Sequence, residues 1–363
     1  MKDNTPKLTK GSPPKAIFSM MVPMVIGLIV IIGNGLVDAY FIGQLGYAQL
    51  AAVSYAFPVW FILGGIVMGL GVGTASLASR AIGAGNQGVV REIATHAMIL
   101  SIVVGLFVIA IGLSTIDVVF GFLGANAETM PYVREYMEGY YWGGIVMAVP
   151  MIGNSVMRAS GDAKTPSILM ATMAITNAVL DPILIFGWFG LPALGVKGAA
   201  LASVLSNVLF LIASVLILVY RDNLIQFANH SLNSVIESWK KILHVGLPAI
   251  ASNLIAPLSM ALVTALISSY GQEAVAAYGL AGRLEALIVV IIMSLGGAMS
   301  PYVGQNFGAK RFDRLEDGFK FAARFTLGYS IFCIIFMYLL ACLLYTSDAA
   351  DDTPCVDLGG RRI

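Results

Sequence analysis

The sequence predicts an all-α integral membrane protein with two parallel repeats of six helices, one repeat in each of two lobes. The composition indicates a membrane protein, because 58% of the 363 residues are hydrophobic, only 11% are charged and the mean hydropathy is +0.86. A fixed internal offset indicates duplication: Pro23 and Gly46 recur as Pro248 and Gly271, 225 residues later. An ordinary soluble domain is therefore excluded.

The internal repeat runs along two apolar blocks without a gap. Helix-punctuating Pro and Gly residues stand at matched places in both blocks, which favours duplication. A second copy as long as the first would end at about residue 445, so we expect twelve helices in the full protein and about nine here. The remaining matched pairs are Ala51/Ala276, Ala52/Ala277, Ala56/Ala281, Met68/Met293, Leu70/Leu295, Gly71/Gly296, Gly83/Gly308 and Ala84/Ala309.

Six apolar stretches make the first repeat, and each is long enough to cross a bilayer, which takes about 20 residues. The first follows a polar N-terminus without the cleavage site of a signal peptide, so we expect a retained tail. The second holds the glycine-dense run GGIVMGLGVGTAS, in which small residues let membrane helices pack closely. The six stretches cover residues 17–42, 51–79, 93–115, 132–155, 167–189 and 196–220.

Three further stretches belong to the second repeat, at residues 243–268, 275–303 and 322–344. The last of them stops abruptly in a polar, acidic run with no counterpart in the first repeat. That run, CLLYTSDAADDTPCVDLGGRRI, resembles translated sequencing adaptor, so we expect a non-native tail. The predicted division is a tail at 1–15, an N-lobe at 16–220, a linker at 221–242, a partial C-lobe at 243–344 and the non-native tail at 345–363.

The distribution of Lys and Arg predicts the orientation in the membrane. Only Arg134 and Lys197 fall in the segments on one side. Since basic residues gather on the cytoplasmic side, we expect the N-terminus to be cytoplasmic. The basic residues of the other side are Lys2, Lys7, Lys10, Lys15, Arg80, Arg91, Arg158, Lys164, Arg221, Lys240, Lys241, Lys310, Arg311, Arg314, Lys320 and Arg324.

The linker at 221–242 has two possible structures. Leu224, Phe227, Val235 and Trp239 could form the apolar face of a helix on the membrane surface. We favour a plain connector between the lobes. The linker marks the lobe boundary in either case.

Ionisable residues inside the apolar stretches are the strongest functional signal. An Asp at the centre of a membrane helix costs about 2.5–3.5 kcal/mol on insertion scales, so it is rarely kept without a use. Asp38 and Asp181 both lie in the outer half of their stretches. Arg283 and Glu285 are two residues apart and do not share a helix face, so an ion pair with other helices is as reasonable for them as a transport role.

The two aspartates share a local pattern. Asn34 precedes Asp38 by four residues and Asn177 precedes Asp181 by four, so each pair projects from one helix face. If the two faces meet, they form a cage of two carboxylates and two amides, which suits Na⁺ or a shared proton. The structural alternatives are that Asp38 reaches to the outer interface and that Asp181 caps a break at Pro182.

Enzymatic and cofactor signals are missing from the sequence. His96, His230 and His244 have no second ligand at metal-binding spacing, so we interpret them as structural. No zinc-protease helix, Walker loop, dinucleotide fingerprint or nucleophile elbow occurs in the sequence. We therefore expect no enzyme, no cofactor beyond a coupling ion and no nucleic-acid partner.

Several segments resemble the multidrug and toxic-compound extrusion (MATE) family. The most specific is NAVLDPILIFGWFGLPALGVKGAALAS, which begins at Asn177. RASGDAKTP after the fourth stretch, GLVDAYFIGQLG in the first and SPYVGQNFGAK at the end of the eighth add to it. The resemblance covers residues 16 to 344.

This resemblance implies a twelve-helix antiporter with two lobes around a central cavity. Such a protein works as a monomer in the plasma (inner) membrane and exports drugs or organic cations in exchange for Na⁺ or H⁺ by alternating access. The resemblance places the cation site at Asp38, Asn177 and Asp181, with Tyr136 and Ser203 as weaker candidates. The seventh stretch lacks the acidic residue that some members carry there, which favours coupling through the N-lobe.

The resemblance also assigns a conformational role. Pro23 matches a proline of the first helix that bends in some members. Two other functions remain as alternatives: a flippase for lipid-linked oligosaccharides from the same superfamily, and a channel or sensory membrane protein. A flippase would need basic residues to hold pyrophosphate, whereas this N-lobe offers acids.

Overall fold

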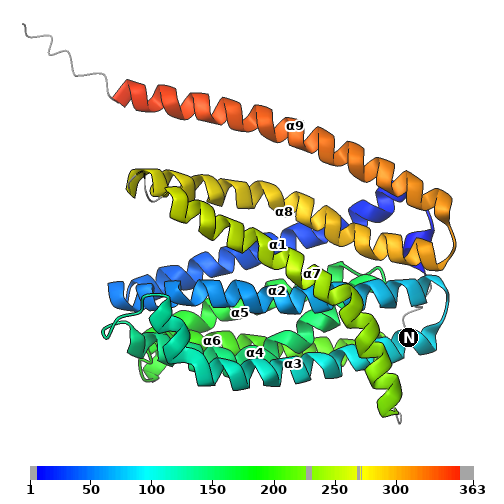
Figure 1. The fold of residues 1–363 in the computed structure, drawn as a ribbon, viewed down its shortest axis with the longest axis horizontal. Helices are drawn as coiled ribbons and strands as arrows, with labels where there is room; N and C mark the ends of the chain where they lie inside the picture. The colour runs from blue at the N-terminus through cyan, green and yellow to red at the C-terminus, as the bar shows by residue number, and fades with distance from the viewer. Residues whose placement is uncertain (1–5, 226–230, 268–269, 271, 352–363) are drawn as a thin grey trace, which may run out of the picture. The chain divides into compact units, whose positions relative to one another are not determined.

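The computed structural model of the protein describes residues 6–225, 231–267, 270 and 272–351 (Figure 1). These described residues form nine α-helices of 21 residues or more and contain no strand. The all-α class predicted above is therefore confirmed. The helices are α1 Pro13–Gly43, α2 Tyr47–Gly83, α3 Gln87–Phe122, α4 Met130–Ala159, α5 Lys164–Phe186, α6 Val196–Leu216, α7 Leu232–Ile267, α8 Gln272–Gly308 and α9 Phe312–Asp351.

Each predicted apolar stretch is centred on one of these helices. By length and hydropathy, eight helices in the described part of the chain could cross a membrane. The helix outside that set is α4, because Arg134, Glu135 and Glu138 lie in its first third and a run rich in Gly, Tyr and Trp follows them. The sequence therefore overestimates the apolar character of α4, although the helix itself is present.

Turn residues set several helix ends. Asn86 caps α3, since its side-chain oxygen accepts a hydrogen bond from the Val89 N–H at 3.2 Å. The residue before it, Gly85, has φ +76°, a left-handed conformation that favours glycine. We call the end of the bundle with this turn and the α4–α5 and α8–α9 turns the basic end, since Arg80, Arg158 and Lys310 lie there.

The core forms two hydrophobic clusters at different levels of the bundle. One lies toward the basic end and includes Ile82 and Met157, both buried. The other lies toward the opposite end and includes Phe120 and Met137, both 0% exposed. Helices α2, α3 and α4 contribute to both clusters, so they tie the two levels together.

Glycines let α2 approach α7 and α8 closely. A Cβ added at Gly69 would lie 2.7 Å from the backbone nitrogen of Ile250 in α7. A Cβ at Gly83 would collide with the backbone of Gln305 in α8. Small residues at such places are how membrane helices bring their backbones together. The end of α2 is therefore packed against α8 at the basic end.

The N-terminal segment is not a free polar tail. Lys7–Thr9 forms a short 3-10 turn in which Leu8 and Thr9 are buried. Asn306 donates a hydrogen bond to the Leu8 carbonyl at 3.2 Å, and Arg314 donates to the Gly11 carbonyl at 2.7 Å. Partners from α8 and α9 thus hold this segment, a contact that composition alone did not indicate.

The connection between α6 and α7 also departs from a plain connector. Helix α7 begins at Leu232, inside the predicted linker, so part of the linker is helical. The indole nitrogen of Trp239 donates to the His96 carbonyl at 2.9 Å, and His96 Nδ1 lies 2.8 Å from Ser238 Oγ. These polar contacts bind the start of α7 to α3. Phe227, from the predicted apolar face, lies outside the described residues.

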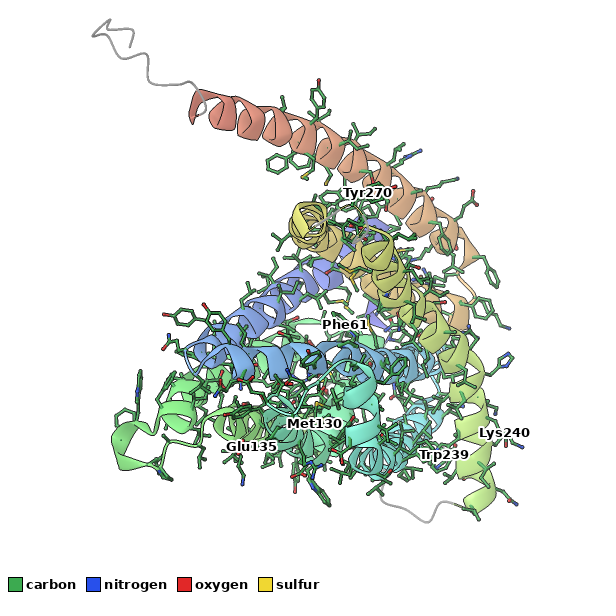
Figure 2. All side chains as sticks on the ribbon, turned by 60° about the vertical axis from the view of Figure 1, so that its left-hand side comes forward. Phe61, Met130, Glu135, Trp239, Lys240 and Tyr270 are labelled. Carbon is green, nitrogen blue, oxygen red and sulfur yellow. The ribbon has the colours of Figure 1, made fainter. Side chains whose placement is uncertain are left out.

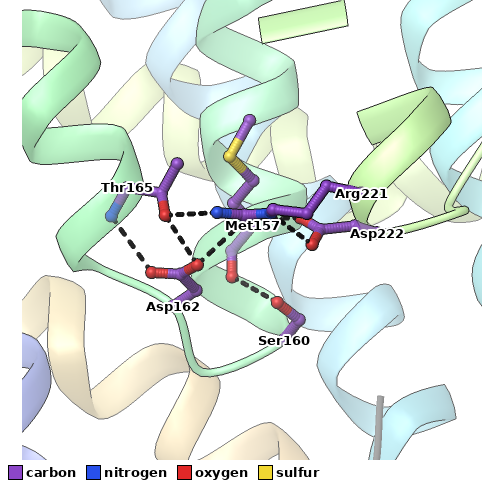
Figure 3. Close-up of polar contacts among 6 residues, drawn as sticks. All are labelled: Met157, Ser160, Asp162, Thr165, Arg221 and Asp222. Carbon is purple, nitrogen blue, oxygen red and sulfur yellow. Dashed lines mark hydrogen bonds and ion pairs between the residues drawn. The ribbon is translucent and has the colours of Figure 1, made fainter. Parts of the chain in front are cut away.

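An ionic cluster lies at the C-terminal end of α6 (Figure 3). The helix ends in a π-helical turn, Ile217–Arg221. Arg221 Nη2 contacts Asp162 of the α4–α5 turn at 3.0 Å and Asp222 at 2.7 Å, and Nη1 donates a hydrogen bond to Thr165 Oγ1 at 2.7 Å. Asp162 also accepts from the Thr165 N–H at 3.0 Å. The cluster therefore fixes α5 to the end of α6.

Residues from Phe319 onward form a separate compact unit. Within it α9 continues to Asp351, past the boundary predicted at residue 344. The helix meets no proline before Pro354, so nothing in the sequence breaks it at the change to polar residues. Phe325 and Tyr329 stack one turn apart, with ring centroids 6.2 Å from each other.

Candidate functional site

The two Asn–Asp pairs meet where α1 packs against α5. Asn34 Nδ2 in α1 donates a hydrogen bond to Asn177 Oδ1 in α5 at 2.9 Å. In each helix the aspartate lies four residues beyond the asparagine, so Asp38 and Asp181 face the same region. The two carboxylates are close enough to interact electrostatically. The structure therefore brings together the four residues of the predicted cage.

Asn177 is the centre of the cluster. Its Nδ2 lies 3.3 Å from Asp181 Oδ1 and 3.4 Å from Ser203 Oγ in α6. Asn177 is 3% exposed and Asp181 is 0% exposed, although α5 is one of the helices that could cross a membrane. Three helices thus contribute polar side chains to one buried position.

Several oxygen atoms in this cluster have no hydrogen-bond partner among the described residues. They are Asn34 Oδ1, Asp38 Oδ1 and Asp181 Oδ2, and each is buried. An unpaired buried oxygen is costly, and natural proteins rarely keep one without a ligand, water or proton to satisfy it. Carboxylate, amide and hydroxyl oxygens are the ligands that a hard cation prefers. The chemistry of the cluster therefore fits Na⁺ or protons.

Tyr136 in α4 lies beside the same cluster. It is 7% exposed and lies near both Asp38 and Asp181. Its ring stacks on Tyr140 at 6.4 Å between centroids, and Tyr140 lies 6.0 Å from the ring of Trp60 in α2. Tyr140 and Trp60 were not predicted from the sequence, because aromatic residues are common in membrane helices and only packing shows that these two rings extend the aromatic contacts of Tyr136.

The remaining predicted residues lie apart from this cluster or are not described. Pro23 lies within α1, where it removes the hydrogen bond to the carbonyl four residues earlier. Glu285 in α8 is exposed, and the side chain of Arg283 lies outside the described residues. A group of three or more His, Cys, Asp and Glu side chains that could hold a metal does not occur in the part of the chain that the structure describes.

Comparison with protein families gives a match over most of the chain. The MatE family model matches residues 23–183 and again residues 248–353. The two matches begin at Pro23 and Pro248, the first pair of the internal repeat. The chain belongs to the MATE family. It is therefore a transporter and not an enzyme. The second match runs past residue 344, into the segment that we expected to be non-native.

Two relatives of this chain are named for different cargoes. The FAD transporter of Shewanella oneidensis is 33% identical over 86% of this chain and 69% of its own length. The multidrug export protein MepA of Staphylococcus aureus is 29% identical over 88% of this chain and 70% of its own. Both alignments cover well over half of this MATE chain.

A solved structure agrees with the fold of this MATE chain. It is described as the outward-facing conformation of a multidrug resistance MATE family transporter of the MOP superfamily. The two share 31% sequence identity with a TM-score of 0.86, over 94% of this chain and 76% of that one. The family match and this likeness favour the MATE interpretation over the flippase and channel alternatives.

Proposed function

We propose that this MATE transporter is a secondary antiporter that exports drugs or organic cations in exchange for Na⁺ or H⁺. It acts as a monomer in the plasma (inner) membrane, with its N-terminus in the cytoplasm. The observation that carries the proposal is the set of unpaired buried oxygens at Asn34, Asp38 and Asp181. A cation or proton that enters the cluster satisfies these atoms and reduces the repulsion between the two carboxylates.

Coupling follows from the helices that hold the site. Asp38 belongs to α1, whereas Asn177 and Asp181 belong to α5, so cation binding draws the two helices together at this level. Pro23 gives α1 a point at which it can bend in response. A cation that favours one arrangement of α1 shifts the population toward it and lowers the affinity for substrate. By reciprocity, bound substrate lowers cation affinity by the same factor.

The alternating-access step requires a structural change at the basic end, which lies on the cytoplasmic side in this mechanism. There the ends of α2 and α8 are in close contact through Gly83, Gly304 and Gly308. The cytoplasmic opening of the transport cycle requires these contacts to separate, as expected for alternating access. Cation release into the cytoplasm would then restore the unpaired oxygens and prepare the site for the next cycle.

A second cargo, FAD or a related dinucleotide, is favoured by one observation. The relative named as an FAD transporter shares 33% identity with this chain, compared with 29% for MepA. An anionic cargo would not bind to the acidic cluster itself, so the same cation site would couple its export. The two cargoes therefore share one mechanism and differ in the substrate contacts.

The test measures ethidium and FAD efflux from cells that express the complete gene, with and without an inward Na⁺ gradient. Asp181→Asn removes a charge from the buried cluster, and Asp117→Asn, in an exposed pair with Arg134, is the control. We expect efflux to fall at least about tenfold in Asp181→Asn and to persist in Asp117→Asn, since about 1.4 kcal/mol of lost coupling gives that factor. Efflux retained in both variants would contradict cation coupling at this site.

A further inference from the structure

A second polar site, none of whose lining residues belongs to the cation cluster, lies in a groove between the first turns of α4 and α6 at the end opposite the basic end. The groove has a volume of about 830 Å³, within the roughly 300–1,000 Å³ typical of small-molecule sites. Arg134, Glu135, Glu138 and Lys197 line its upper part, and Trp142 lines it one turn deeper. Figure 2 labels Met130 and Glu135 on this part of α4.

Small residues set the register of α4 and α6. A Cβ added at Gly139 would lie 2.9 Å from the Cβ of Ala200, and one added at Gly143 would lie 2.9 Å from Val204. Both pairs are 61 positions apart in the sequence, so the two helices run parallel in a fixed register. The same offset puts Lys197 level with residue 136, between Glu135 and Glu138.

In the described part of the chain, the charged residues that line the groove do not form ion pairs with one another. Arg134 pairs with Asp117 at 2.6 Å. Within the described residues, no ion pair joins Lys197 to Glu135 or Glu138, although all three line the groove. Lys197 and Glu138 are both exposed. A ligand with one positive and one negative group can therefore contact both signs of charge at once, whereas a simple cation would be repelled by Lys197.

The level of the groove relative to the membrane indicates that such a ligand would be a lipid headgroup. Helix α4 has 30 residues and is about 45 Å long, which exceeds a hydrocarbon core of about 30 Å. If Arg158 lies at the membrane surface of the basic end, the core ends about 20 residues earlier, near Glu138. Trp142 is 65% exposed and lies one turn inside that level, where the aromatic belt of membrane proteins occurs.

We propose that this groove binds the headgroup of a zwitterionic phospholipid with a primary ammonium, namely an ethanolamine phospholipid. Lys197 contacts the phosphate, and Glu135 and Glu138 accept hydrogen bonds from the ammonium. Trp142 and Leu201 contact the upper part of the acyl chains. The bound lipid fills the seam between α4 and α6, so it stabilises the helices that carry Tyr136 and Ser203.

The test is native mass spectrometry of the purified full chain with equal amounts of ethanolamine, choline and glycerol phospholipids of the same acyl chains. We expect preferential retention of the ethanolamine lipid by about fivefold, the factor that about 1 kcal/mol of weak ionic contacts gives. Lys197→Gln and Glu138→Gln should remove the preference, and Lys197→Arg should keep it. The controls are Lys164→Gln and Glu128→Gln, which change exposed charges outside the groove.

A second measurement needs no charge variant. Ethanolamine lipid with brominated acyl chains should quench the fluorescence of Trp142, and Trp142→Phe should lose that quenched component. Equal retention of all three lipids, or unchanged preference in both charge variants, would overturn the proposal. A preference for the glycerol lipid would show an anionic-lipid site instead, and quenching by ethidium without any lipid preference would show an organic-cation site. Either outcome would also overturn it.

Discussion

Gln305 in α8 accepts a hydrogen bond from the backbone N–H of Leu8 at 3.0 Å. Its amide nitrogen donates at 2.7 Å to the carbonyl oxygen of Ala159, the last residue of α4. Gln305 is 0% exposed and Leu8 is 3% exposed. One buried side chain therefore links the N-terminal segment, the first repeat and the second repeat at the basic end of the bundle.

Replacing this side chain should release the N-terminal segment. Gln305→Ala leaves the Leu8 N–H without its partner, which costs about 1–3 kcal/mol when the group stays buried. We expect faster amide hydrogen exchange across residues 6–11 and a lower free energy of unfolding in detergent. Lys310→Ala, an exposed change near the end of α8, is the control. Unchanged exchange at residues 6–11 would show that Gln305 does not hold the segment.

The glycines between α2 and α8 should be intolerant of a methyl group. A Cβ at Gly308 would collide with the backbone of Arg80, whereas a Cβ at Gly296 in the same helix would meet no atom within 4 Å. Gly308→Ala should therefore lower the free energy of unfolding by about 1–3 kcal/mol through overpacking. Gly296→Ala should leave stability unchanged or raise it by up to about 1 kcal/mol, since Ala favours helix.

Thermal unfolding in detergent compares these two alanine variants directly. The pair is matched because both replace a glycine of α8 by the same residue. Similar melting temperatures for the two variants would mean that the close approach of α2 and α8 is not needed for stability.

The positions of the helices could be predicted from the sequence because long apolar runs are a local signal. The start of α7 and the burial of Leu8 could not, since both depend on partners far along the chain. Leu8 looks like part of a polar tail until Gln305 and Asn306, nearly 300 residues away, are placed beside it. Such contacts leave no pattern in the local sequence.

In the candidate site, too, features with a local sequence signal could be predicted, whereas features that depend on packing could not. The four-residue spacing of Asn34 with Asp38, and of Asn177 with Asp181, could be read from the sequence because helix geometry puts such residues on one face. The hydrogen bond between Asn34 and Asn177 depends on how α1 and α5 pack. The position of Trp60 beside the tyrosines of α4 depends on packing alone.

Arg221 should contribute more to stability than an exposed basic residue does. Its partner Asp222 has a side chain only 2% exposed, so Arg221→Gln leaves a buried carboxylate with a weaker partner. Breaking a buried ion pair lowers the free energy of unfolding by about 3–5 kcal/mol. Because Arg221 is partly exposed, we expect Arg221→Gln to lower it by about 1–3 kcal/mol. Denaturant unfolding of the purified protein measures the difference.

The matched control for Arg221 is Lys241→Gln. Lys241 pairs with Glu237 four residues earlier at 2.7 Å, and both side chains are more than 60% exposed. An exposed pair of this kind contributes little to stability, because solvent screens the two charges. An equal loss in the two variants would indicate that the Arg221 cluster is no stronger than a surface ion pair.

Asn34 and Asn177 should act as one unit in the cation site. Asn177→Ala removes the contacts of Asn177 with Asn34, Asp181 and Ser203. Asn34→Ala removes only the contact with Asn177. We therefore expect Asn177→Ala to lower the free energy of unfolding more than Asn34→Ala does. In a double-mutant cycle the two should couple by about 0.5–1.5 kcal/mol, the net contribution of one hydrogen bond. Ser203→Ala, which removes only the 3.4 Å contact, is the conservative comparison.

The same variants separate a structural role from a role in cation binding. A cation that binds only the folded protein raises its melting temperature as the cation concentration rises. We expect added Na⁺, or protons if the site is proton-coupled, to stabilise the unmodified protein and to lose that effect in Asn177→Ala. A coupling energy near zero, together with full cation stabilisation of Asn177→Ala, would place the bound cation elsewhere. A normal coupling energy with full stabilisation would instead make Asn177 a packing residue, because its hydrogen bonds would then hold α1 against α5 without contacting the ion.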